Sequence, residues 1–187
     1  CLHDAGIPKG VINLVNGQAD KIGNEMLSNA AVRKISFTGS TRVGRILMDG
    51  ASKTHTRLSL ELGGNAPVLV FADVDVKRVA EESVTAKLRN AGQVCIAPQR
   101  YLVQEDIAAE FIRHATNRMK AIKVGNGLEE GVEMGPMINL QQRANLEKLV
   151  KSSVESGGQV VTGGGHGSQP KGYFFEPTLV QHAGKNN

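Results

Sequence analysis

Aromatic residues and cysteines are scarce in this 187-residue sequence: it has no tryptophan, 4% aromatics in total and two cysteines. A nucleic-acid groove usually combines stacking rings with a basic stripe. Here the basic residues are scattered and the net charge is a mild +4, so we expect no nucleic-acid partner. Two distant thiols do not make a disulfide framework. We therefore expect a reducing compartment, which is the cytoplasm or, alternatively, the mitochondrial matrix.

Long apolar runs and paired histidines are also lacking. No run is long enough to span a bilayer, so we expect no membrane association. The five histidines are far apart, and the sequence gives no readable metal site. The opening residues, from Cys1 to Pro8, look like the end of a helix running into a turn. We therefore expect residue 1 to be an internal point of a longer chain.

Short apolar runs alternate with amphipathic stretches along the sequence. This alternation is typical of parallel βα units, and we predict an α/β fold. Strands are predicted at 11–15, 32–37, 57–62, 67–71, 100–104 and 160–162. Helices are predicted at 20–29, 41–52, 75–89 with Asp75 as N-cap, 106–122 and 140–156. A domain boundary is expected near Gly63 and Gly64, which interrupt two strands.

The first segment suited to chemistry is 35–41, in which an apolar strand ends in Thr38-Gly39-Ser40 just before a helix. Helix N-termini present unpaired N–H groups and a partial positive charge, and glycine lets a phosphate approach the backbone. The segment therefore fits a pyrophosphate site. An ordinary serine N-cap fits it too, and neither a Gly-x-Gly-x-x-Gly nor a Walker pattern is present.

The second segment is 58–65, where Glu61 stands among leucines in a strand that stops at two glycines. A carboxylate surrounded by leucines would be partly desolvated, which suits a general base or a proton shuttle. The alternative is an alternating strand with Glu61 on its wet face.

The third segment is 89–98, which holds Cys95 in a loop of small residues between a helix and a strand. A cysteine in such a loop is accessible enough to react, whereas a structural cysteine is usually buried within an element. Gly92 and Pro98 fix the shape of the loop. From the residues alone a nucleophilic and a passive role both remain open, and Cys95 with Glu61 is also compatible with a cofactor-free esterase or acyltransferase.

Together, in this order and spacing, the three segments resemble the aldehyde dehydrogenase superfamily. Residues 37–41, 60–64 and 90–95 are the most specific, and 59–67 and 89–93 look most like succinate-semialdehyde dehydrogenases. The resemblance implies an incomplete aldehyde dehydrogenase fold. Residues 1–62 would be the C-terminal part of the NAD(P)-binding domain, and residues 63–187 the N-terminal part of the catalytic domain.

The resemblance also implies an activity, the oxidation of an aldehyde such as succinate semialdehyde to its acid with NAD or NADP. Cys95 matches the nucleophile, which passes through a thiohemiacetal and a thioester, and Glu61 matches the base that activates the hydrolytic water. The cofactor-binding positions that match are Gly39, Ser40, Val43 and Leu62. In the intact enzyme a homo-oligomer is implied.

Arg89 matches the arginine that pairs with the distal carboxylate of the substrate in succinate-semialdehyde dehydrogenases, and a guanidinium fork suits a carboxylate. The alternative is a solvated cation at a helix end, which the helix dipole favours. Ala97 occupies the position where some members carry a second cysteine. The family's Pro-Trp-Asn and Glu-x-Phe-Gly-Pro segments are absent, so a catalytically incompetent fragment or remnant is the alternative to an active enzyme.

Overall fold

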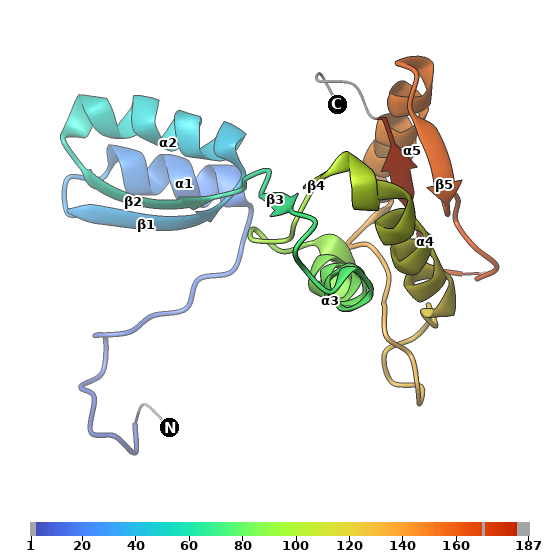
Figure 1. Ribbon diagram of the computed structural model, residues 1–187. Coiled ribbons are helices and arrows are strands. Elements are labelled where there is room, and N and C mark those ends of the chain that lie inside the picture. Colours follow the sequence, from blue (N-terminus) through green and yellow to red (C-terminus); the bar gives the residue numbers. More distant parts are fainter. Residues whose placement is uncertain (1–2, 170, 183–187) are drawn as a thin grey trace. The chain divides into compact units, whose positions relative to one another are not determined.

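The computed structural model describes residues 3–169 and 171–182, so Cys1 lies outside the described residues (Figure 1). Contacts divide the chain into two compact units, of which the first ends at Gly63 and the second begins at Gly64. Each unit contains a parallel strand pair with helices beside it, which confirms the predicted α/β class. Within the described residues, no helix combines the length and apolar character that crossing a membrane requires.

The first unit is built on one parallel strand pair. Its elements are α1 (Ala19–Ser28), β1 (Lys34–Gly39), α2 (Thr41–Thr54) and β2 (Arg57–Leu62). Side chains alternate along both strands, so Ile35 and Leu58 share one face while Ser36 and Ser59 share the other. Helix α2 packs against both strands, and α1 packs against α2 (Figure 1). The buried positions of this unit, Ile35 among them, therefore lie between the strands and α2.

The strand predicted at 11–15 is wrong. These residues have no strand conformation, and the apolar side chains of Val11, Leu14 and Val15 are exposed. A strand needs a neighbour to satisfy its backbone N–H and C=O groups. The described part of the chain offers 11–15 no such neighbour, so an apolar run alone does not produce a strand here.

The second unit also has a parallel pair at its centre. Its elements are β3 (Pro67–Val70), α3 (Val76–Leu88), the 3₁₀ turn η1 (Arg89–Gly92), β4 (Arg100–Val103), α4 (Glu105–Ala121), α5 (Leu140–Glu155), β5 (Gln159–Thr162) and β6 (Leu179–Gln181). Helices α3 and α4 pack extensively on each other. Val84 and Phe111 are among the residues buried in the core between these helices, and the Phe111 ring lies 5.8 Å from that of Tyr101 on β4.

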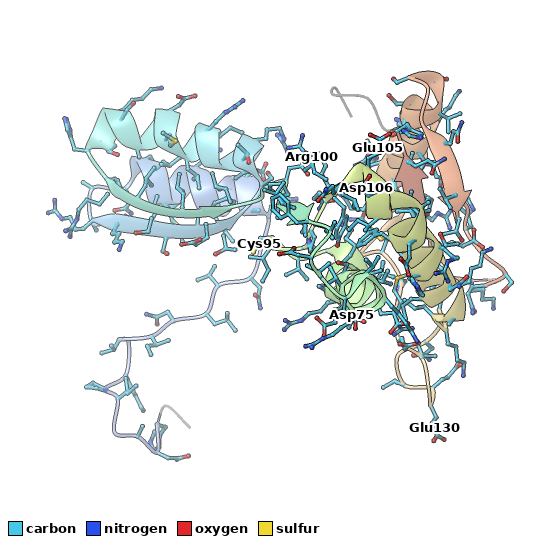
Figure 2. The ribbon with its side chains drawn as sticks, in the orientation of Figure 1. Asp75, Cys95, Arg100, Glu105, Asp106 and Glu130 are labelled. Atoms are coloured by element: carbon cyan, nitrogen blue, oxygen red, sulfur yellow. The ribbon has the colours of Figure 1, made fainter. Side chains whose placement is uncertain are left out.

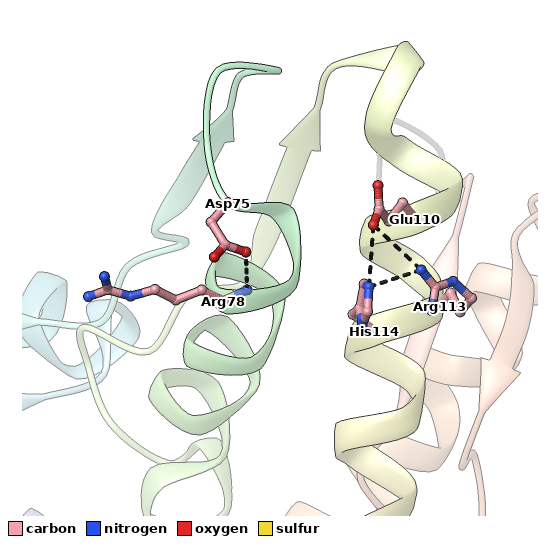
Figure 3. Close-up of polar contacts among 5 residues, drawn as sticks. All are labelled: Asp75, Arg78, Glu110, Arg113 and His114. Atoms are coloured by element: carbon pink, nitrogen blue, oxygen red, sulfur yellow. Dashed lines mark hydrogen bonds and ion pairs between the residues drawn. The ribbon is translucent and has the colours of Figure 1, made fainter.

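Polar side chains at the surface define the ends and flanks of these helices. The Asp75 carboxylate accepts a hydrogen bond from the backbone N–H of Arg78 at 3.0 Å, so it caps α3 as predicted (Figure 3). On α4, Glu110 lies within 3.5 Å of both Arg113 and His114 (Figure 3). The Arg113 guanidinium also lies 2.9 Å from His114 Nε2, so the three side chains form one polar cluster on α4.

The pair β5–β6 departs from the parallel pattern, because these two strands run antiparallel. Strand β6 was not predicted at all. It is three residues long, and so short an apolar run carries no periodicity by which a sequence could distinguish it from a loop.

Candidate functional site

Several of the residues singled out in the first unit come together at one edge of its strand pair. Thr38 lies beside Glu61, and Gly39 lies beside Leu62, in the parallel register of β1 and β2. Both strands end there, and α2 begins directly after β1. The carboxyl edge of a parallel pair next to a helix N-terminus is where α/β folds commonly bind ligands.

Ser40 directly precedes α2 at this edge, and Val43 lies in the first turn of the helix. The Ser40 hydroxyl oxygen accepts a hydrogen bond from the Val43 N–H at 3.3 Å, so Ser40 is an N-cap. A capping hydroxyl keeps its own proton for donation, and the other N–H groups of a first turn have no partner within the helix. Arg42 and Arg45 add two exposed positive charges. Capping and anion binding are therefore compatible at this position.

Two glycines at this edge lie in close contact with neighbouring side chains. A Cβ at Gly44 would lie 2.8 Å from a methyl group of Leu62, so α2 sits directly on the end of β2. A Cβ at Gly39 would lie 2.4 Å from the Phe37 ring. A larger residue at either position would require the Leu62 or Phe37 side chain to move.

Glu61 is exposed in this unit. The expected partial desolvation by leucines is wrong within the unit, because alternation along β2 turns Leu60 and Leu62 to the face opposite Glu61. The alternative, in which Glu61 stands on the wet face of an alternating strand, is what the unit shows. The Glu61 carboxylate is therefore accessible to water in this unit.

Cys95 lies in the second unit, on the loop between η1 and β4 (Figure 2). Its thiol is free and exposed, in a turn closed by a 3.0 Å hydrogen bond from the Ala97 N–H to the Val94 carbonyl. The accessible position expected from the sequence is therefore present. An exposed thiol can reach and attack a small electrophile through its thiolate form.

The backbone just before Cys95 is unusual. Asn90, Ala91 and Gly92 all have positive φ, at 52°, 54° and 75°. The Asn90 side chain donates to the Gln93 carbonyl at 3.3 Å, and the Gln93 N–H donates back to the Asn90 carbonyl at 3.1 Å. These bonds hold three left-handed residues in sequence, a conformation that only glycine adopts without cost.

Gln93 and Lys87 connect this loop to the rest of its unit. The Gln93 side chain accepts from the Ile138 N–H at 2.9 Å and donates toward the Pro136 carbonyl at 3.4 Å. Lys87 donates to the Gln99 side chain at 2.9 Å, and burial lowers the pKa of its ammonium group. Neither residue has a role predicted from the sequence. No local pattern reveals them, since their partners are set by the fold.

Arg89 forms the C-cap of α3 and is exposed. Its guanidinium is therefore available either as a solvated helix-end cation or for an incoming carboxylate. The structure thus groups Gly39, Ser40, Val43, Glu61 and Leu62 in the first unit, and Arg89 with Cys95 in the second. Within the described residues, no cluster of three or more acidic, histidine or cysteine side chains is arranged to hold a metal ion.

Comparisons with known proteins agree with the motifs. A sequence model of the aldehyde dehydrogenase family matches residues 1–187. The NADP(+) succinate-semialdehyde dehydrogenase GabD of Escherichia coli is 42% identical over 176 residues, which are 94% of this chain and 36% of that protein. The mitochondrial succinate-semialdehyde dehydrogenase of rice is 45% identical over 94% of this chain and 33% of its own length.

Solved structures give the same result. A succinate-semialdehyde dehydrogenase from Burkholderia pseudomallei matches with a TM-score of 0.93 and 39% identity, over 98% of this chain and 38% of that one. A betaine aldehyde dehydrogenase from Staphylococcus aureus in complex with NAD+ matches with a TM-score of 0.92 and 35% identity, over 96% and 36%. The chain thus spans about a third of the length of these relatives.

Proposed function

Because this chain belongs to the aldehyde dehydrogenase family, we propose that it carries the nucleophile and the base of an enzyme that oxidises an aldehyde to a carboxylic acid with NAD or NADP. The observation that carries the proposal is Cys95, a free exposed thiol on a loop whose backbone is fixed by hydrogen bonds. The overall reaction consumes one aldehyde, one water and one oxidised cofactor. It releases the acid, the reduced cofactor and a proton.

Cys95 is the residue that forms a covalent bond in this proposal. Its thiolate sulfur attacks the aldehyde carbon, giving a thiohemiacetal, and the backbone N–H of Cys95 is one donor available to the oxyanion. Loss of hydride from that carbon leaves a thioester on Cys95. Glu61 then takes a proton from the water that attacks the thioester, which releases the acid and restores the thiol.

The residues of the first unit fit a dinucleotide phosphate, and they support the proposed cofactor. The first turn of α2 offers backbone N–H groups, the Ser40 hydroxyl and the flanking charges of Arg42 and Arg45. The Gly39 backbone lies beside Leu62, and the Leu62 backbone is proposed to contact the nicotinamide carboxamide. When bound, NAD or NADP supplies the hydride acceptor. Val43, half-buried in the same turn, is proposed to lie near the adenine.

The proposed substrate is a short aldehyde with a distal carboxylate, such as succinate semialdehyde. Two kinds of support exist: the named relatives act on semialdehydes, and Arg89 presents an exposed guanidinium six positions before Cys95. We further propose that the first unit is part of an NAD(P)-binding domain and the second part of a catalytic domain. A homo-oligomer and a cytoplasmic or mitochondrial location are proposed for the whole enzyme.

The test is cofactor reduction by the full-length protein that contains this segment. With succinate semialdehyde, we expect an absorbance rise from NADH or NADPH, and Cys95→Ala is expected to lower its rate below about a thousandth. Cys1→Ala, which removes the other thiol, is the matched control and is expected to keep the rate. Turnover by Cys95→Ala at the wild-type rate would disprove the assignment. Ester hydrolysis without any cofactor reduction would favour a cysteine-dependent esterase instead.

A further inference from the structure

The Gln93 carboxamide joins the Cys95 loop to a segment more than forty positions further along the chain. Its oxygen accepts from the Ile138 N–H at 2.9 Å, and its nitrogen donates toward the Pro136 carbonyl at 3.4 Å. The same nitrogen donates to the Asn90 carbonyl at 3.2 Å. The Gln93 side chain therefore bonds both to its own loop, at Asn90, and to the 136–138 segment.

The 136–138 segment is itself firmly attached to the second unit. Met137, between the two partners of Gln93, is buried, and its N–H donates to the Tyr173 carbonyl at 2.9 Å. The neighbouring Phe174 and Phe175 are buried as well. Gln93 is thus bonded to an exposed segment, Pro136 and Ile138, that the buried Met137 between them anchors to the second unit.

The thiol has no comparable support of its own. The Cys95 side chain is exposed, and no hydrogen bond from it to another described residue sets its direction. Its position follows from the backbone of the turn that begins at Val94, directly after Gln93. The hydrogen bonds that hold the Gln93 side chain therefore also hold the residue at which the Cys95 turn begins.

We infer that Gln93 is a positioning residue, which holds the Cys95 turn against the 136–138 segment so that the sulfur meets the aldehyde carbon at a fixed place. The inference rests on the proposed function, because it concerns the same nucleophile. Reaction rates depend steeply on such placement, and a displacement of about 1 Å can lower a rate about a hundredfold. Thiol reactivity toward a small alkylating agent depends instead on thiolate fraction and access.

The test is Gln93→Met in the full-length protein, which keeps the side-chain length and removes all three hydrogen bonds. We expect kcat for aldehyde oxidation to fall about 10- to 100-fold, with the KM for the cofactor unchanged. The rate of Cys95 alkylation by iodoacetamide across pH is expected to stay within about threefold. Amide hydrogen exchange at 136–138 is expected to become faster, since the Ile138 N–H loses its acceptor.

Gln141→Met is the matched control, because Gln141 is an exposed glutamine on α5 whose side chain donates to its helix neighbour Asn145 at 3.0 Å and, among the described residues, contacts neither the Cys95 loop nor 136–138 by a hydrogen bond. It should leave kcat, alkylation and exchange unchanged. If Gln93→Met does not fold, Gln93→Glu takes its place: it keeps the acceptor for Ile138 and loses both donor bonds, so kcat is again expected to fall while alkylation persists.

Each outcome has a single meaning. A kcat within about twofold of wild type in Gln93→Met would overturn the inference and leave the proposed function standing, since such a change is too small for a displaced nucleophile. A parallel loss of kcat, alkylation and thermal stability would show a purely structural role and would also overturn it. Alkylation and exchange need neither aldehyde nor cofactor. If the wild-type protein shows no turnover, the proposed function fails, and unchanged exchange at 136–138 would then reject the Gln93 contact separately.

Discussion

At the scale of single residues, the loop before Cys95 depends on three consecutive left-handed conformations. Each costs a non-glycine residue about 1–2 kcal/mol, and Asn90 and Ala91 bear that cost. Asparagine tolerates the conformation better than most residues, and Asn90 also bonds within the turn. Gly92 adopts it freely. The strain is concentrated next to the proposed nucleophile, which is where strained backbone is commonly found in enzymes.

Gly92→Ala tests how much this turn depends on glycine. A Cβ at Gly92 would stand at φ +75° and 3.3 Å from atoms of Lys87, including its backbone oxygen. We expect a loss of about 1–2 kcal/mol in the free energy of unfolding, measured by urea denaturation of the full-length protein. Gly127→Ala is the control, because nothing lies within 4 Å of a Cβ there and its φ is not positive. Equal stability of the two variants would contradict this account of the turn.

At the scale of secondary-structure elements, the 125–137 loop is attached to α4 by an ion pair between Glu133 and Arg118. The hydrogen bond from the guanidinium, with its positive charge, lowers the pKa of the Glu133 carboxyl below its ordinary 4.5. A carboxyl whose pKa is lower in the folded state contributes stability above its unfolded pKa. That contribution is lost as the pH falls through the folded value.

Glu133→Gln removes this acid-dependent contribution. At pH 7 we expect the variant to be less stable than the wild type by at most about 1 kcal/mol, because the pair is partly exposed. The difference should begin to shrink near pH 4.5, the ordinary pKa of the unfolded carboxyl, and should vanish once the pH falls below the lowered pKa of the folded carboxyl. Urea midpoints of both proteins at several pH values measure it. Glu130→Gln, an exposed neighbour on the same loop, should show no such gap, and a gap independent of pH would refute the ion-pair explanation.

The elements themselves were largely predictable, because their signals are local. The strand at 57–62 has the predicted bounds, and Asp75 caps α3 as its sequence position indicates. Alternation and capping depend on residues a few positions apart. The strand predicted at 11–15 failed because a strand also needs a partner, and sequence gives no information on whether one lies nearby.

Of the candidate site, the parts with local sequence signals were likewise predictable and the long-range contacts were not. The motifs identified Cys95 and the first turn of α2 as chemically interesting. The support from Gln93 to Pro136 and Ile138 was not visible, since it joins positions 43 and 45 residues apart. A contact at that separation is set by how α4 and the following loop return to the Cys95 turn. No propensity of the glutamine itself encodes it.

At the scale of the whole chain, both units leave large apolar side chains exposed, Ile46 and Met48 in the first and Leu69 and Leu102 in the second among them. In the second unit Leu69 on β3 lies beside Leu102 on β4 in the strand register, and their exposed fractions are 63% and 55%. Phe71 extends the same patch. Contiguous apolar patches of this kind mark surfaces that contact other protein. The chain matches a little over a third of the length of these relatives. The relatives therefore contain further polypeptide of a size that could cover such apolar patches.

The 187-residue chain produced alone is therefore expected to self-associate. Its mass by light scattering should rise with protein concentration, because burying the Leu69 and Leu102 side chains against another copy removes apolar area from water at about 25 cal/mol per Å². Leu69→Lys with Leu102→Lys places two like charges on adjacent strands and should reduce the association. Leu128→Lys is the control, since Leu128 is a single apolar residue on a loop with an exposed fraction of 95%. A mass that stays monomeric at all concentrations would contradict the predicted self-association. If Leu128→Lys reduces association as much as the Leu69→Lys and Leu102→Lys pair does, net charge rather than this patch controls the association.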